Sequence, residues 1–335
     1  MDRIPRLRSM SADEGPSRRI WSRLPDGARR ALTEELSPTD LQSLLLDVTR
    51  QRAKAVRPAR LTQRWASDRF VRPEPIDPRR SAALEARLWE LLPDRFEGVE
   101  LSPVTPLGTC AALGAADQNK VLGTIRNSEV VSDPTNVLAL EAAARRRAGA
   151  APTVHLAACQ RLLRTQQFAP GWGSHFKLFA LVSSARDQGS ARTEADLLIA
   201  QLQYWQRVLT TLLPQRPGQI SYSVFDNPTL DQRMVDTVLP AVGAMGSSDD
   251  GIDWVADPGR TRARGYYASG ALLINAGGHE LGDGGFTDWT AQLLADRKER
   301  CLISCMSISG LLALDPVIDR GRQPEKRDSG RQSLR

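Results

Sequence analysis

Two arginines and one short acidic motif are the residues whose types could do chemistry. Arg164 lies in an apolar stretch, and Arg262 precedes a pair of tyrosines. An arginine at such a position can stabilise negative charge that builds up on a ligand. Asp133 and Thr135 stand at the expected start of a helix, where a carboxylate can hold an ammonium group. The same two residues would also make an ordinary helix N-cap, so both interpretations stay open.

A tyrosine pair and a glycine pair follow Arg262. Tyr266 and Tyr267 begin a stretch with strand character, and Gly284 and Gly285 indicate a turn that leads into a helix. Glycines let the backbone approach a ligand closely. Alone, the tyrosines are equally well explained as half-buried strand aromatics, and the glycines as a plain turn.

The cysteines and histidines predict no metal site. Cys301 and Cys305 are separated by three residues in a largely apolar segment, and the three histidines show no ligand spacing. A metal ion there would need two further ligands. Buried free thiols are therefore expected, and four cysteines do not make a disulfide framework in a chain of 335 residues.

The helices and strands that must position these residues are predicted to form an α+β fold, in which helices flank an antiparallel sheet. Hydrophobic periodicity, caps and breakers indicate helices and strands without the regular alternation of a parallel α/β protein. Helices are expected at 37–56, 61–70, 81–92, 135–147, 193–213, 288–300 and 309–314. Strands are expected at 99–104, 120–125, 129–131, 162–167, 177–184, 221–224, 252–255, 266–275 and 301–307.

Composition divides the chain into four parts. Residues 1–34 are predicted to be a flexible basic segment and 35–78 a small helical extension with a proline-rich linker; 79–315 form the main domain, and 316–335 a disordered basic tail. Residues 1–80 carry a net charge of +7 and 320–335 of +4, so the remainder carries −5 of the total of +6. Basic ends of this kind can contact RNA or acidic partners. The apolar runs are too short to span a bilayer and no secretory signal is seen, so the expected location is the cytoplasm.

From about residue 80 to 315 the order of these segments resembles the catalytic domain of class II aminoacyl-tRNA synthetases of the histidyl type. That resemblance implies that Asp133 and Thr135 hold the α-amino group of a substrate. It places Arg164 where the family arginine contacts the ATP α-phosphate and the amino-acid carboxylate. Gln166 replaces a family glutamate, and His175 lies beside the position of a family loop arginine and could substitute for it.

The later motifs are matched less completely. The resemblance implies that Arg262 assists adenylate formation, that Tyr266 and Tyr267 line an amino-acid pocket, and that Gly284 and Gly285 form its glycine turn. The third motif departs from the family, because Leu312 and Ala313 occupy the positions of its glutamate and ATP-clamping arginine. Replacing an arginine at a phosphate site is not conservative. We also expect no anticodon-binding domain in the residues after 315.

The resemblance predicts a synthetase-like paralog, not a conventional tRNA-charging enzyme. It would bind an amino acid or similar small carboxylic acid and activate it with ATP and Mg²⁺ as an acyl-adenylate, for transfer to a carrier or other acceptor. The alternative is a non-catalytic, amino-acid-sensing regulatory subunit like that of short-form ATP phosphoribosyltransferase, with a protein partner. A third hypothesis is an RNA-binding accessory protein that uses the basic ends. A homodimer is expected, and whether the chain is an enzyme stays open at this point.

Overall fold

The computed structural model describes residues 16–114, 117–149, 151–168, 173–244 and 252–314. The chain forms two compact units, Met1–Ala66 with Thr124–Asn127 and Ser67–Gly123 with Ser128–Arg335. Residues 1–15 of the predicted flexible segment, and the whole predicted tail 316–335, lie outside the described residues.

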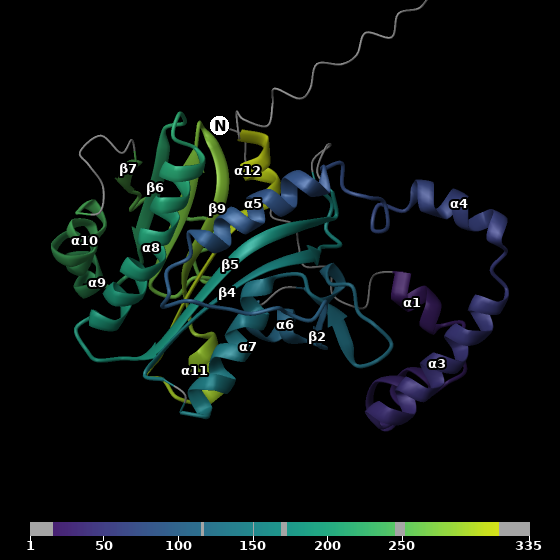
Figure 1. Cartoon of the computed structure of the whole chain (residues 1–335). Helices are drawn as coiled ribbons and strands as arrows, with labels where there is room; N and C mark the ends of the chain where they lie inside the picture. The colour runs from purple at the N-terminus through teal and green to yellow at the C-terminus, as the bar shows by residue number, and fades with distance from the viewer. Residues whose placement is uncertain (1–15, 115–116, 150, 169–172, 245–251, 315–335) are drawn as a thin grey trace, which may run out of the picture. The chain divides into compact units, whose positions relative to one another are not determined.

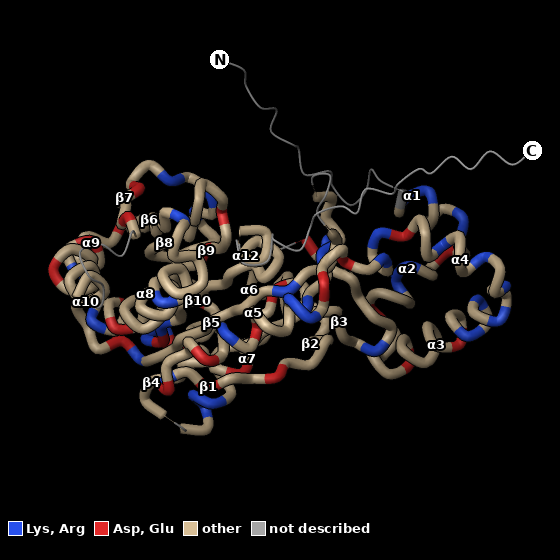
Figure 2. The backbone as a smooth tube through the Cα atoms, turned by 45° about the horizontal axis from the view of Figure 1, so that its top comes forward, with Lys and Arg blue, Asp and Glu red and all other residues tan. Residues whose placement is uncertain are grey.

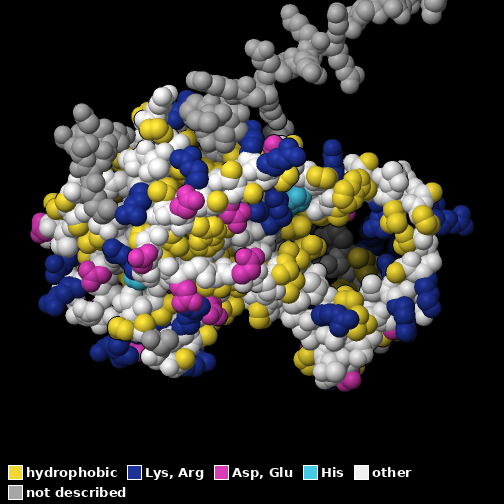
Figure 3. All heavy atoms as spheres, viewed as in Figure 1, with side chains coloured by type: hydrophobic (Ala, Val, Ile, Leu, Met, Phe, Trp, Pro, Cys, Tyr) yellow, Lys and Arg dark blue, Asp and Glu magenta, His cyan; other side chains and the backbone are white. Residues whose placement is uncertain are grey.

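The first unit is helical. It contains α1 (Pro16–Trp21), α2 (Ala28–Arg30), a π-helical turn (Ala31–Glu35), α3 (Pro38–Lys54) and most of α4 (Pro58–Ser67). As the sequence predicts, α3 begins at Ser37, whose hydroxyl accepts a hydrogen bond from the Asp40 amide at 3.1 Å. None of the residues from α2 to α4 is buried. Basic residues recur along α3 and α4 (Figure 2). Hydrophobic side chains are visible at the surface of the molecule (Figure 3). Leu61 and Trp65 of α4 are among the exposed ones.

The second unit is built on an eight-stranded sheet in the order β1-β4-β5-β10-β9-β8-β6-β7. Its pairs are antiparallel except β1 with β4 and β6 with β7. The strands are β1 (Glu97–Gly98), β4 (Thr153–Leu163), β5 (His175–Arg186), β6 (Gly218–Val224), β7 (Ile252–Ala256), β8 (Gly270–Ala276), β9 (His279–Thr287) and β10 (Glu299–Ser307). A second sheet pairs β2 (Val104–Pro106) with β3 (Ser128–Val130).

Helices cover both faces of the large sheet (Figure 1). One face packs against α5 (Pro78–Glu90), α8 (Arg192–Leu212) and α12 (Ile308–Leu314), where the larger apolar core forms around Tyr204 and Trp205. The other face packs against α7 (Pro134–Arg147) and α11 (Trp289–Leu294). Shorter elements complete the unit: α6 (Thr109–Gly114), a 3-10 turn (Gln118–Lys120), α9 (Pro228–Arg233), a π-helical turn (Met234–Val238) and α10 (Leu239–Gly243). This confirms the predicted α+β class, an antiparallel sheet flanked by helices.

Several predicted elements were wrong in kind. Residues 120–125 are not a strand, because Asp117 caps a 3-10 turn there with its carboxylate on the Asn119 amide at 3.0 Å. Residues 99–104 are extended but hold no strand until Val104, although the Val99 amide donates to the Ala157 carbonyl. Conversely, β4 begins at Thr153, ahead of the predicted 162–167, through a run rich in small residues with weak strand preference.

The predictions for the tyrosine pair and the glycine pair were both wrong: the tyrosines lie in a turn and the glycines lie in a strand. Tyr266 and Tyr267 lie in a turn, with both amides donating to the Ala263 carbonyl at 3.1 and 3.0 Å, and β8 begins only at Gly270. Gly284 and Gly285 lie inside β9, between β8 and β10, and form no turn. The predicted helix 288–300 is shortened to α11, since Ala295 adopts a left-handed φ of 52°.

Candidate functional site

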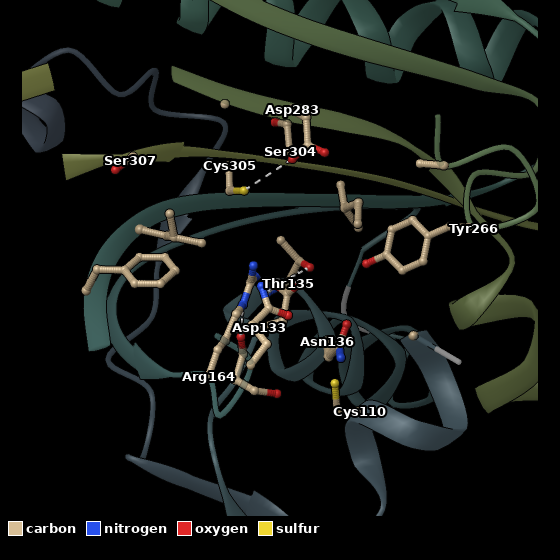
Figure 4. A pocket seen from close by; sticks show the side chains of 18 of the residues that line it. Cys110, Asp133, Thr135, Asn136, Arg164, Tyr266, Asp283, Ser304, Cys305 and Ser307 are labelled. Carbon is tan, nitrogen blue, oxygen red and sulfur yellow. Dashed lines mark hydrogen bonds and ion pairs between the residues drawn. The ribbon is translucent and has the colours of Figure 1, made fainter. Parts of the chain in front are cut away.

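A cavity of about 680 Å³ opens in the second unit on the α7 side of the sheet (Figure 4). Its walls come from the start of α7, the segment after β4, the first residues of β5, the turn before β8, and the central strands β9 and β10. Segments that are far apart in the sequence therefore meet around one space. A cavity of this size is typical of small-molecule sites.

The start of α7 supplies a carboxylate and a hydroxyl to one wall. Asp133 is the N-cap, and its Oδ1 accepts hydrogen bonds from the Thr135 amide at 3.0 Å and the Thr135 hydroxyl at 2.7 Å. Both residues line the cavity. Asp133 thus caps the helix with one oxygen, and its Oδ2 receives no hydrogen bond from any residue in the described ranges.

Arg164 lies beside Asp133, just after β4. Its Nε donates to the Ser132 carbonyl at 2.8 Å, and its guanidinium lies 5.6 Å from the centre of the Phe176 ring. Its Nη2 is 3.6 Å from Asp133 Oδ2, an ion pair too long to be a hydrogen bond. Within the described part of the chain, neither terminal nitrogen makes a hydrogen bond, so the fork of the guanidinium is available to a ligand.

Arg262 is paired within the protein. Its two terminal nitrogens donate to the two carboxylate oxygens of Glu280 at 2.7 and 2.9 Å, and its side chain is 64% exposed at the rim. This bidentate pair raises the pKa of Arg262 further above its ordinary value. The charge of Arg262 is therefore balanced by Glu280 before any ligand arrives.

The turn before β8 and the central strands form the opposite wall. The Tyr266 ring contacts Tyr267 edge to face at 4.9 Å between centroids, and burial raises the pKa of both phenols. The Tyr267 hydroxyl donates to Asp283 Oδ2 at 3.2 Å, and the Cys305 sulfur lies 3.9 Å from Asp283 Oδ1. Burial, with the Asp133 charge second, raises the pKa of Asp283.

The structure brings most of the predicted site residues together. The cavity is lined by Asp133, Thr135, Arg164, Gln166, Arg262, Tyr266 and Tyr267. His175 does not line it: its ring nitrogens face the Arg72 carbonyl at 2.7 Å and Arg161 at 3.0 Å, at the start of β5. His175 thus holds the linker against the sheet.

The glycine pair acts on the cavity indirectly. Gly284 and Gly285 do not line it, but a Cβ added at Gly285 would lie 2.5 Å from a carbon of the Tyr267 ring. Gly285 therefore leaves the space into which the Tyr267 ring packs. The glycines are needed for close packing inside a sheet.

Four functional candidates were missing from the sequence prediction: Asn136, Glu280, Asp283 and Cys305 line the cavity. Only Asp283 had a usable signal, an acidic residue between two glycines in a strand. The third-motif positions lie away from the cavity lining, with Leu312 buried in the core and Ala313 exposed on α12. Positions 312 and 313 therefore supply no arginine to the cavity, as the sequence predicts.

Known structures share this fold. A histidyl-tRNA synthetase from S. aureus superposes with a TM-score of 0.52 at 15% identity, over 75% of this chain and 69% of that chain. An ATP phosphoribosyltransferase regulatory subunit/histidyl-tRNA synthetase from Bacillus halodurans gives 0.51 at 11% identity, over 73% and 82%. A histidine–tRNA ligase subunit from Alicyclobacillus acidocaldarius gives 0.52 at 13% identity, over 75% and 96%.

No protein-family model matches the chain, and no curated protein sequence does. The chain has the fold of a class II aminoacyl-tRNA synthetase catalytic domain, as its motif order predicts. At 11–15% sequence identity the similarity shows a shared fold, and a shared fold does not establish a shared activity. None of the helices in the described ranges is long and apolar enough to cross a membrane.

Proposed function

We propose that the cavity binds an amino acid, or a similar small molecule that carries both an amino group and a carboxylate. The observation that carries this proposal is the placement of Arg164 beside Asp133 and Thr135 on one wall. The ligand carboxylate would accept two parallel hydrogen bonds from the terminal nitrogens of Arg164. The ligand ammonium would donate to Asp133 Oδ2 and the Thr135 hydroxyl, which lie at the start of the same helix.

The site supports binding without ATP more strongly than it supports adenylate formation. A triphosphate with Mg²⁺ needs unpaired cations around it, and Arg262 is already neutralised by Glu280. Ala313 supplies no charge at the expected clamp position, while Asp133, Asp283 and Glu280 place carboxylates on the walls. These residues do not fit ATP in the manner that the resemblance implies. We therefore favour a binding or sensing role, in keeping with the words "regulatory subunit" in the name of the B. halodurans protein.

Adenylate formation with ATP and Mg²⁺ is the second candidate. One observation favours it: the terminal nitrogens of Arg164 make no hydrogen bond in the described part of the protein, so they could hold an α-phosphate instead of a carboxylate. In either case we propose a cytoplasmic homodimer that acts through a protein partner or carrier, with RNA contacts confined to the basic ends. Size-exclusion chromatography with light scattering would measure the oligomeric state.

Two measurements distinguish the candidates. Thermal shift and calorimetry across the common amino acids should find at least one ligand, whose affinity falls by tenfold or more in Arg164→Ala and Asp133→Asn. Arg186→Ala is a matched control, because Arg186 lies at the far end of β5 and contacts Asp296. ATP–pyrophosphate exchange on the same panel should be absent. Exchange that depends on Arg164 would instead establish adenylate formation, and affinities unchanged in both variants would refute the site.

A further inference from the structure

Asp283 differs from the other carboxylates of the cavity in forming no ion pair with any described cation: the charge of Arg262 acts on it, but Arg262 is itself paired with Glu280. Asp133 lies 3.6 Å from Arg164, and Glu280 is held by Arg262 at 2.7 Å. Among the described residues, Asp283 has only the Tyr267 hydroxyl and the Cys305 thiol as donors, at 3.2 and 3.9 Å. A partly buried carboxylate without a counter-ion is costly, so a cationic ligand group beside Asp283 would favour its charged form and gain a strong interaction.

Asn136 is a second acceptor without a donor. It lies on the first turn of α7, is 2% exposed, and lines the cavity. Its Oδ1 receives no hydrogen bond from the described residues. Buried amide oxygens are normally satisfied, so one that faces a cavity indicates a missing donor. Asn136 adjoins Asp133 and Thr135, and it adds an acceptor to the end of the cavity where the ammonium group is placed.

The two sets of acceptors face each other. Figure 4 shows Asp133, Thr135 and Asn136 on one side of the cavity and Asp283 with Cys305 on the other. An α-ammonium at the start of α7 would be taken up by the first set, and Asp283 on the opposite wall would still have no cation paired with it. A second positive charge on the ligand would supply that partner.

We propose that the ligand is an amino acid with a second protonated nitrogen on its side chain, of the diamino-carboxylic type. Its α-ammonium would donate to Asp133, Thr135 and Asn136, its carboxylate would accept from Arg164, and its second ammonium would pair with Asp283. This inference rests on the proposed function and names the ligand class of that same site. The three protons of an ammonium suit a wall that offers acceptors in several directions.

A matched ligand series tests the second charge. Calorimetry would compare lysine and ornithine with norleucine and norvaline, whose side chains have similar length and no charge. The wild-type chain should bind the diamino acids at least tenfold more tightly than the neutral ones. In Asp283→Asn, an isosteric change, that preference should fall by tenfold or more, while affinity for the neutral amino acids changes less than threefold.

The outcomes separate this inference from the function on which it rests. Neutral amino acids that bind as tightly as diamino acids, with no effect of Asp283→Asn, would overturn the second charge and leave the amino-acid site intact. An equal loss for all ligands in Asp283→Asn would also overturn it, because the residue would then be structural. The thermal midpoint of Asp283→Asn and its binding of norleucine show whether the variant is folded. No binding of any ligand in the series to the wild-type chain would overturn the inference together with the proposed function.

Discussion

Gly285 in β9 allows a direct test of how the wall of the cavity is built. A Cβ at this position would lie 2.5 Å from the Tyr267 ring and 2.5 Å from the Gly270 carbonyl oxygen. Neither neighbour can give way freely, because Gly270 is backbone in β8 and Tyr267 is 3% exposed. In Gly285→Ala, either the ring or the strand pairing must therefore move.

The expected cost follows from that overlap. Forcing one extra methyl group into a packed interior costs about 1–3 kcal/mol or more. For a unit of this size, each kcal/mol lowers the melting temperature by about 2–4 °C. Gly285→Ala should therefore lower it by about 2–12 °C. Displacement of the Tyr267 ring would also remove its hydrogen bond to Asp283, so the preference for diamino acids over neutral ones should change as well.

Thermal and urea unfolding, followed by circular dichroism, would measure the change. Gly123→Ala is the control, because a Cβ at Gly123 meets nothing within 4 Å, and the change should stay within about 0.5 kcal/mol. If the two variants unfold alike, the packing argument for β9 is refuted.

Three further predictions concern charges. Arg146 forms a largely buried ion pair with Glu299 at 2.8 Å. Glu299→Ala removes the carboxylate and leaves the guanidinium without its counter-ion, so the free energy of unfolding, measured in urea, should fall by about 3–5 kcal/mol. A loss below about 1 kcal/mol would contradict this. Burial lowers the pKa of His155 from 6.5 to about 4, so the unfolded chain takes up a proton first as pH falls. Stability should therefore drop by up to about 3 kcal/mol between pH 6.5 and 4, and His155→Gln should lose less over that window. Arg262→Ala should cost no more than about 1 kcal/mol because its pair with Glu280 is exposed, and it should leave amino-acid affinity within threefold by calorimetry; a tenfold loss would restore a direct role for Arg262.

Local signals in the sequence predicted those parts of the fold that depend on neighbouring residues. The starts of α3 and α7 follow from Ser37 and Asp133, whose side chains cap the helices they precede. The order of motifs predicted the class II fold, and it named seven of the residues that line the cavity. At these positions, the residue type and its place in the order of motifs were sufficient to predict the structural role.

Features that depend on strand register could not be predicted in this way. Nothing local indicates that Arg262 meets Glu280, eighteen positions later, or that Asp283 faces Tyr267 without a cation. A glycine pair is a typical turn signal. Only the three-dimensional neighbours of Gly285, namely the Tyr267 ring and the Gly270 carbonyl, explain why the pair lies in mid-strand instead.

The glycines of β9 also limit how this cavity can change. Added Cβ atoms at Gly282, Gly284 and Gly285 would all approach other atoms within 2.5 Å or less, so no larger residue can be introduced there without rebuilding the sheet. New ligand preferences, whether selected in the laboratory or acquired by drift, must therefore arise at the surrounding side chains. Asn136 and Cys305 are the positions where we expect such variation to concentrate, because they face the same space from elements that tolerate a side chain.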